Sequence, residues 1–214
     1  MNGTFLKRPF DILLSGIGLI ISSWLWVLIA FAIIFEDGFP VFIRQKRIGK
    51  GGRFFRSYKF RSMSKSTLNE KINVQACEND HRVTGVGRVL RMTAFDELPQ
   101  LLNIFLGDMS FVGPRALLPV EREVNGNDEE NIHIRNVPGY DERIKVCPGL
   151  TGIAQVYAPR DLPRKDKFKY DLFYIREMNL LLDIKLIYLS FLVTFKGQWE
   201  NRDKKLEILE KIRV

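Results

Sequence analysis

The chain has 214 residues, of which 46% are hydrophobic and 27% charged, and this composition excludes both a disordered polymer and a polytopic membrane protein. Its 33 lysines and arginines exceed its 25 acids, giving a net charge of +8. The whole excess lies in residues 38–69, which contain nine bases and no acid, whereas the rest of the chain holds 24 bases and 25 acids. So focused a positive charge indicates an anionic partner: a nucleic acid, lipid headgroups or substrate phosphates.

An apolar run precedes this basic stretch. Residues 12–35 carry no formal charge, and about 20 apolar residues are enough to cross a bilayer. Lys7 and Arg8 stand before the run and the basic stretch follows it, so positive charge, which favours the cytoplasmic side, lies at both ends. Ser22 and Ser23 lie at its middle, where serine side chains can bond to helix carbonyls and bend the helix. The residues are therefore compatible with a single span and with a bent, re-entrant helix.

The rest of the chain predicts a mixture of short strands and helices. The predicted strands are residues 41–45, 54–60 and 153–156, of which the first two form a hairpin around a glycine-rich turn at 47–53. The predicted helices are residues 85–92, 96–106, 168–177, 180–195 and an amphipathic tail at 203–214. Residues 64–82, 110–119 and 121–143 are expected to be loops, the first and last with some helix. We expect an α+β fold, mainly helical, in which residues 1–38 anchor a membrane-associated domain spanning residues 39–214 with interfacial helices such as 180–195.

The adjacent acids Asp96 and Glu97 stand at the start of a predicted helix, because Pro99 is tolerated only in a first turn. One interpretation is structural: an aspartate there caps the helix and a glutamate suits its dipole. The other is catalytic, because a carboxylate can attack phosphorus when cations neutralise the phosphates. Candidate cations are Lys59, Arg88, Arg91 and Arg115, together with a divalent metal held by carboxylate.

Several other kinds of site are excluded. The glycines around Lys50 lack the lead-in and the Lys-Ser/Thr ending of a nucleotide-binding P-loop. Cys77 and Cys147 are far apart and the two histidines lie near neither, so the sequence predicts free thiols rather than a disulfide framework or a zinc site. No Ser-His-Asp pattern occurs.

The motifs, taken in order, resemble the bacterial sugar transferase family, the monotopic phosphoglycosyl transferases. They are Lys7-Arg8-Pro9-Phe10-Asp11, Gln45-Lys46-Arg47-Ile48-Gly49, Tyr58-Lys59-Phe60-Arg61-Ser62-Met63, Phe95-Asp96-Glu97-Leu98-Pro99-Gln100-Leu101, Gly107-Asp108-Met109-Ser110-Phe111-Val112-Gly113-Pro114-Arg115 and Pro148-Gly149-Leu150-Thr151-Gly152-Ile153-Ala154-Gln155. The resemblance runs from about residue 7 to residue 185. It implies an enzyme on the cytoplasmic face of the bacterial inner membrane, with Mg²⁺ as cofactor. Such an enzyme transfers a sugar 1-phosphate from a UDP-sugar to polyprenyl phosphate, usually undecaprenyl phosphate, and releases UMP in the first membrane step of a glycoconjugate pathway.

The same resemblance implies roles for individual residues. Asp96 would attack the sugar-bearing phosphate, form a covalent aspartyl phosphosugar and contact Mg²⁺, while Glu97 assists. Substrate binding is carried over to Lys59, Arg91, Arg115, Gln155, Asp171 and Asp183. The apolar run is expected to be re-entrant, although Trp24 stands where the family has the proline of its Ser-Pro break. Two further departures are Ala116 in place of proline and Cys147 in place of arginine.

The partners expected on this basis are a UDP-sugar, polyprenyl phosphate and anionic membrane lipid, with a homodimer as a further candidate assembly. Two other hypotheses compete with the enzyme. One is a non-catalytic membrane scaffold that binds anionic lipid through the basic stretch. The other is a membrane-tethered nucleic-acid binder, which is disfavoured because the basic stretch offers no recognition helix.

Overall fold

The structure, a computed structural model, describes residues 5–66, 80–119, 122–123, 132–159 and 162–195. The helices are α1 (Lys7–Asp37), α2 (Gly85–Thr93), α3 (Gln100–Leu106), α4 (Tyr140–Arg143), α5 (Ile153–Tyr157), α6 (Arg164–Glu177) and α7 (Leu180–Phe195), and the 3₁₀ turns are η1 (Lys50–Gly52), η3 (Phe95–Glu97) and η4 (Ile134–Asn136). Strands pair in twos: β1 (Phe42–Ile48) with β2 (Phe54–Phe60) and β4 (Arg122–Glu123) with β5 (Ile132–His133) are antiparallel, and β3 (Ser110–Val112) with β6 (Gly149–Thr151) is parallel. This confirms the predicted α+β class, mainly helical, for the described residues.

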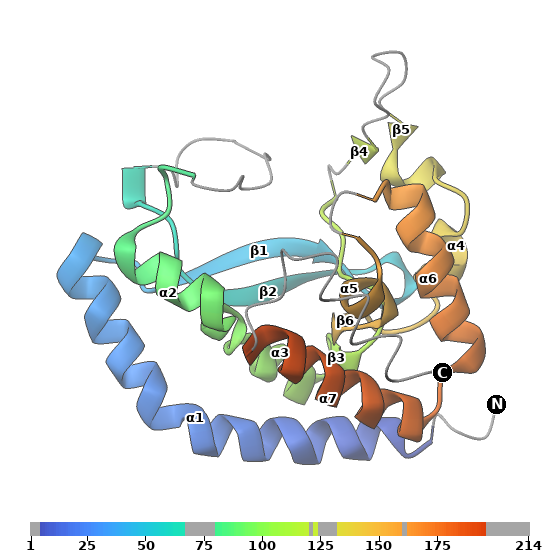
Figure 1. Cartoon of the computed structure of the whole chain (residues 1–214), viewed down its shortest axis with the longest axis horizontal. Helices are drawn as coiled ribbons and strands as arrows, with labels where there is room; N and C mark the ends of the chain where they lie inside the picture. The colour runs from blue at the N-terminus through green and yellow to red at the C-terminus, as the bar shows by residue number, and fades with distance from the viewer. Residues whose placement is uncertain (1–4, 67–79, 120–121, 124–131, 160–161, 196–214) are drawn as a thin grey trace.

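The long helix α1 is bent near its middle and runs along the lower edge of the molecule (Figure 1). At its midpoint the Ser23 hydroxyl donates to the Ile20 carbonyl (2.8 Å), and the Ser22 hydroxyl accepts a hydrogen bond from Trp26 Nε1 (3.1 Å). Serine-to-carbonyl bonds of this kind often bend helices, and here the bend occurs at Ser22 and Ser23 with no proline beside them.

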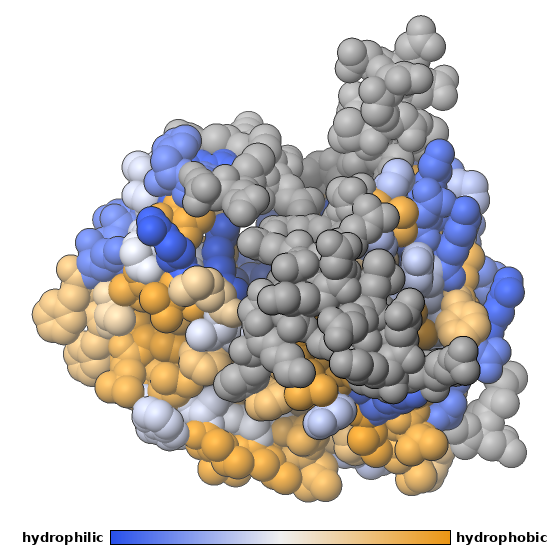
Figure 2. Space-filling model, viewed as in Figure 1, coloured by the Kyte–Doolittle hydropathy of each residue, from blue (hydrophilic) through white to orange (hydrophobic). Residues whose placement is uncertain are grey.

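The surface of α1 is strongly apolar. Among the described residues α1 is the one helix long and apolar enough to cross a membrane, and 11% of its most apolar window is buried in the protein. Length and composition would also fit a core helix or a signal sequence, but exposed side chains such as Ile20 (76%) and Trp24 (64%) do not fit a core helix. Figure 2 shows this apolar surface along the lower edge of the molecule. Exposed apolar residues also occur on α2, α3 and α7, namely Val89, Met92, Phe105, Leu106, Leu181, Ile184, Tyr188 and Phe191.

Helix α3 packs directly on the first half of α1. Gly18 permits the close approach, since a Cβ there would lie 3.1 Å from the side chain of Leu101. Arg8 of α1 then donates to the carbonyls of Ile104 (2.6 Å) and Phe105 (2.8 Å) at the end of α3. A cation bonded to the last carbonyls stabilises a helix C-terminus. This contact explains why a basic residue precedes the apolar run.

The predicted hairpin is confirmed, with a longer first strand than expected. Its base packs against α1, where Phe42 and Phe60, opposite each other in the register, contact the Trp26 ring at centroid distances of 6.0 and 5.5 Å. Asn103 of α3 holds the second strand from the other side: it accepts from the Tyr58 amide (3.0 Å) and donates to the Arg56 carbonyl (2.8 Å).

The main core lies between α3, β3, α5, α6 and α7. Its fully buried members include Ile104, Val112, Val156, Tyr174, Leu186 and Leu189. Helix α7 has the predicted bounds, and it buries one face in this core while it exposes the other.

Four local predictions were wrong. Within residues 121–143, expected to be loop with some helix, β4 and β5 form an antiparallel pair. Residues 153–156 form the helix α5, because Ile153 and Val156, three residues apart, turn together into the core. The strand of this region is β6, which ends before the glycine at 152. The predicted helix 96–106 is two elements, η3 and α3, separated by Leu98-Pro99, and the predicted loop 110–119 contains the strand β3. The predictions for residues 67–79 and for the tail at 203–214 fall outside the described residues.

Candidate active site

Asp96 and Glu97 lie in the tight connection between α2 and α3. Helix α2 ends at Thr93, its C-cap residue Ala94 adopts a left-handed conformation (φ 57°), and the 3₁₀ turn η3 follows at once. The residue that precedes α3 is Pro99, and no side chain caps that helix. Asp96 therefore does not cap α3, and the structural interpretation of this acid was wrong. The turn instead leaves both carboxylates half-buried at the side of the hairpin.

Lys59 binds Glu97 through a short ion pair. Lys59 comes from β2, where it lies opposite Ile43 of β1, and its side chain is 17% exposed against 25% for Glu97. Partial burial keeps water from screening such a pair fully, so its electrostatic effect is larger than that of a surface pair.

The two acids titrate in opposite directions. Burial raises the pKa of Asp96 to about 6, and the neighbouring Glu97 charge adds to this effect, although Lys59 and Arg91 oppose it. Burial acts in the same direction on Glu97, but the attraction of Lys59, Arg115 and Arg47 outweighs it and lowers its pKa to about 2. Neighbouring carboxylates whose pKa values are pushed apart are typical of catalytic sites. At neutral pH both groups are ionised, with Asp96 the more basic of the two.

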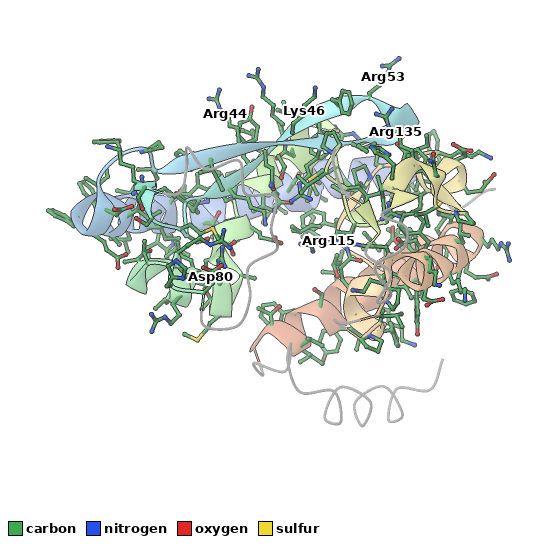
Figure 3. The ribbon with its side chains drawn as sticks, turned by 90° about the horizontal axis from the view of Figure 1, so that it is seen from above. Arg44, Lys46, Arg53, Asp80, Arg115 and Arg135 are labelled. Carbon is green, nitrogen blue, oxygen red and sulfur yellow. The ribbon has the colours of Figure 1, made fainter. Side chains whose placement is uncertain are left out.

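Further cations surround the acids on several elements. Arg91 of α2 is held by a bond from its Nε to the Ser62 hydroxyl (3.0 Å). Arg47 of β1 donates to Gln45 Oε1 (2.5 Å) and to the Ala116 carbonyl (2.9 Å). In Figure 3, Arg115 lies between the hairpin and α7, toward the middle of the view. Its side chain is exposed and so accessible to a ligand. Arg88, by contrast, is simply an exposed residue of α2.

A glycine junction sets the position of Arg115. The segment Gly113-Pro114 crosses the segment around Gly149, with hydrogen bonds from the Gly113 amide to the Thr151 carbonyl and from the Gly149 amide to the Pro114 carbonyl (each 2.9 Å). A Cβ on Gly113 would lie 2.5 Å from the Cys147 carbonyl, so no side chain fits there. The crossing brings two of the sequence motifs into direct contact.

Gln155 belongs to this junction. It lies on α5, and its Oε1 would be 2.9 Å from a Cβ on Gly152. Its half-buried side chain is thus next to the junction that carries Arg115.

Asp171 forms a buried ion pair with Arg143. Its Oδ2 accepts from Arg143 Nε at 2.7 Å, and the two side chains are 3% and 5% exposed. The same Arg143 donates through Nη2 to the Arg115 carbonyl (2.7 Å). Asp171 therefore contacts the site through Arg143 and the backbone of Arg115.

Asp183 lies in a second buried network, below β3. It accepts from Lys7 Nζ (2.5 Å) and from the Tyr174 hydroxyl (2.7 Å). Lys7 also donates to the Val112 carbonyl (2.9 Å), one residue before the glycine junction. The network joins the first turn of α1 to α6, α7 and β3, and the structure does not bring Asp183 together with Asp96.

Of the two acids, Asp96 is the one that could hold a magnesium ion. Among the described residues, no group of three or more His, Cys, Asp or Glu side chains could hold a metal ion. Magnesium, however, is commonly bound by one or two carboxylates together with water and substrate phosphates. Asp96 suits that mode, whereas Glu97 is already engaged by Lys59.

Comparisons with known proteins identify the family to which this chain belongs. A sequence model of the family described as "Bacterial sugar transferase" matches residues 2–197. The chain belongs to the bacterial sugar transferase family. It is 41% identical over 196 residues to a UDP-glucose:undecaprenyl-phosphate glucose-1-phosphate transferase of Klebsiella pneumoniae, covering 89% of this chain and 40% of that protein.

Two further relatives extend the comparison. A UDP-N-acetylgalactosamine-undecaprenyl-phosphate N-acetylgalactosaminephosphotransferase of Aeromonas hydrophila is 38% identical over 90% of this chain and 44% of its own length. The exopolysaccharide production protein PSS of Rhizobium leguminosarum bv. phaseoli is 36% identical over 86% of this chain and 92% of its own length. The chain thus spans less than half of the two long relatives and nearly all of the short one.

Sequence reasoning missed three residues that the structure connects to the site. Arg47 could have been found, because it shares a strand face with Gln45 and Ile43, and Ile43 is opposite Lys59. Lys7 was read as a topology signal and as part of a family motif, but its ion pair with Asp183 was not expected. Arg143 lies in a polar segment without any distinguishing pattern, so only the three-dimensional structure identifies its link from Asp171 to Arg115.

Proposed function

We propose that this bacterial sugar transferase moves a sugar 1-phosphate from a UDP-sugar to polyprenyl phosphate and releases UMP. The observation that carries the proposal is Asp96, a half-buried carboxylate of raised pKa with Lys59 and Arg91 beside it. Two relatives are named as transferases that act on a UDP-sugar and undecaprenyl phosphate, which supports the same reaction class.

In the first step, an oxygen of Asp96 attacks the phosphorus that carries the sugar. A new bond forms between this oxygen and phosphorus, and the bond from phosphorus to the bridging oxygen breaks. UMP leaves with that electron pair, so the charge balance needs cations near the bridging oxygen. The raised pKa makes Asp96 a better nucleophile than an ordinary surface aspartate while leaving it ionised at neutral pH.

In the second step, an oxygen of polyprenyl phosphate attacks the same phosphorus. The bond to Asp96 breaks, and the carboxylate is regenerated as polyprenyl diphosphate-sugar leaves. Both steps place a dianionic group against Asp96, and cations there act by stabilising charge that develops in the transition state.

The side chains around Asp96 have different roles in stabilising this charge. Lys59, fixed by Glu97, holds a positive charge beside the nucleophile, which makes Glu97 a positioning residue for Lys59. Arg115 is exposed and available for the diphosphate, and Arg91 lies on the α2 side. A magnesium ion held by Asp96 and the diphosphate would neutralise charge on the leaving group.

The residues farther from Asp96 act through the backbone. Asp171 orients Arg143, which binds the Arg115 carbonyl, and Gln155 packs at the glycine junction. Asp183 holds Lys7 under Val112. We assign these three residues to positioning of the Arg115 loop rather than to direct contact with the substrate.

Helix α1 suits a re-entrant anchor on the cytoplasmic face of the bacterial inner membrane. Its exposed apolar surface and its bend support insertion into one leaflet. Both ends of α1 are tied to the protein: Arg8 donates to carbonyls of α3, and Arg61, which follows β2, donates to the carbonyls of Asp37 and Gly38. The lipid acceptor would then reach Asp96 from the membrane, and the water-soluble donor from the cytoplasm.

The test is a UMP-release assay. The purified chain is incubated with Mg²⁺, undecaprenyl phosphate and, in separate reactions, UDP-glucose, UDP-galactose or UDP-N-acetylgalactosamine. At least one donor should release UMP, and Asp96→Asn should abolish the release. No UMP with any donor, together with Asp96-independent binding to anionic vesicles, would support the scaffold hypothesis instead.

A further inference from the structure

The two faces of the β1–β2 hairpin carry different cations. Strand residues alternate, so Gln45 and Arg47 share the inner face, toward the site, with Lys59. On the outer face the register places Arg44 opposite Tyr58 and Lys46 opposite Arg56. We call Arg44, Lys46 and Arg56 the outer stripe. Figure 3 shows Arg44 and Lys46, with Arg53 of the adjoining turn, pointing outward from the hairpin and away from α6 and α7.

The outer stripe carries uncompensated positive charge. Lys46 and Arg56 are direct cross-strand neighbours, an arrangement in which like charges destabilise a hairpin. All three side chains are exposed, and in the part of the chain that the structure describes none of them forms an ion pair. Folding alone would favour an acid at one of these positions, so the cations fit an anionic ligand.

Aromatic rings support the stripe. The Lys46 ammonium lies 4.1 Å from the centroid of the Phe54 ring, and Arg44 lies 5.7 Å from that of Tyr58. Arg135, from η4, approaches the same Phe54 ring at 5.9 Å. Rings beneath the cations restrict their motion while leaving the charged groups in water.

The stripe adjoins the apolar surface. It begins directly after the aromatic cluster in which Phe42 and Phe60 pack on Trp26 of α1, and Phe42 itself is 43% exposed. Along the outer face of the hairpin, the exposed Phe42 is therefore followed by the cation Arg44 at the next position of the same face. A boundary between acyl chains and headgroups has the same order, whereas a nucleic acid or an acidic protein would not need the apolar margin.

We propose that the outer stripe binds the phosphate headgroups of anionic lipids beside α1, separately from the phosphates handled by Lys59 and Arg115. The basic stretch then serves two ligands on two faces of one hairpin. This inference does not depend on the transfer reaction, because the stripe makes no contact with Asp96 or Glu97 among the described residues.

The test measures which lipid lies beside α1. The full chain, with Trp199→Phe so that fluorescence comes from Trp24 and Trp26, is reconstituted in vesicles of mixed phosphatidylcholine and phosphatidylglycerol. In one preparation the phosphatidylglycerol carries brominated acyl chains, and in the other the phosphatidylcholine does. We expect stronger quenching per brominated lipid from phosphatidylglycerol, and this preference should shrink at high salt.

The decisive variant is Arg44→Gln/Lys46→Gln/Arg56→Gln. Its matched control removes three exposed cations from α6, on another side of the molecule: Lys165→Gln/Lys169→Gln/Arg176→Gln. The stripe variant should lose the preference, with the quenching ratio falling close to unity, and the control should keep it. Three results would overturn the proposal: an equal loss of the phosphatidylglycerol preference in both variants, an unchanged quenching ratio in the stripe variant, or no preference in the parent chain. The last of these results would favour an acidic protein partner.

Discussion

Lys59 binds Glu97, the immediate neighbour of the acid that we assign as nucleophile. One cation therefore controls both carboxylates: it lowers the pKa of Glu97 and limits the rise in the pKa of Asp96. The ion pair also explains why these two acids, adjacent in one turn, differ in pKa and are suited to different tasks: Asp96 to nucleophilic attack and Glu97 to positioning Lys59.

We expect Lys59→Gln to slow UMP release by roughly a hundredfold, as loss of one charge-stabilising donor commonly does. The Asp96 carboxylate must be ionised to attack, so the rate of the first step should fall as the pH drops through about 6. Without Lys59 the pKa of Asp96 rises further, and this acid limb should move to higher pH. The pH profile of single-turnover UMP release measures the shift.

The control for that experiment is Lys169→Gln, which removes an exposed cation of α6. It should leave both the rate and the acid limb unchanged. An unshifted acid limb in Lys59→Gln would show that Lys59 does not act on Asp96.

Asp96→Asn should stabilise the fold while it removes activity. The folded-state pKa of Asp96 is raised, so the folded protein favours the protonated form, and ionisation above about pH 6 opposes folding. A neutral amide removes this cost, and we expect a gain of about 1–2 kcal/mol at pH 7.5 that disappears below pH 4. Thermal unfolding in detergent at the two pH values measures it, and equal shifts at both would contradict the electrostatic cause.

Asp183→Ala should destabilise the protein by about 3 kcal/mol, because it leaves Lys7 without its buried carboxylate partner. The matched change Asp166→Ala breaks the exposed pair with Lys169 and should cost less than about 1 kcal/mol. Denaturant titration compares the two. If Asp183 contacted substrate instead, the variant would keep its stability and lose affinity for the donor.

Glu36 links the end of α1 to α2. Its two carboxylate oxygens accept from the amides of Gly85 (2.6 Å) and Val86 (2.9 Å), and so stabilise the α2 N-terminus from another helix. Glu36→Gln should cost about 1 kcal/mol and, because α2 carries Arg91 toward Asp96, should also lower the rate of UMP release. A loss of stability with an unchanged rate would show that α2 does not transmit its position to the site.

The sequence allowed the strongly patterned elements to be predicted. Both hairpin strands, α2, α6 and α7 follow alternating or helical apolar spacing, and the motif residues Lys59, Arg91 and Arg115 do surround Asp96 and Glu97. Asp96 and Glu97 themselves were placed at a helix start that the structure replaces with a 3₁₀ turn. The break occurs at Leu98-Pro99, where proline ended one element and began the next.

What could not be predicted depends on contacts between distant segments. Residues 153–156 look like a strand in isolation, but Gly152 turns against Gly113 and the following residues coil into the core. Asp171 and Asp183 were expected to bind substrate, and the sequence gives no sign of their buried ion pairs with Arg143 and Lys7. Such pairs join residues 28 and 176 positions apart, for which local patterns carry no signal.

In the mechanism that we propose, Asp96 carries the sugar phosphate between the two substrates. The most direct measurement is the intact mass of the protein after incubation with a donor UDP-sugar and Mg²⁺ in the absence of polyprenyl phosphate, followed by peptide mapping. We predict an added sugar phosphate on Asp96, released as product when polyprenyl phosphate is supplied, and no adduct with Asp96→Asn. UMP release that occurs only when polyprenyl phosphate is present, with no adduct at any time, would contradict the account.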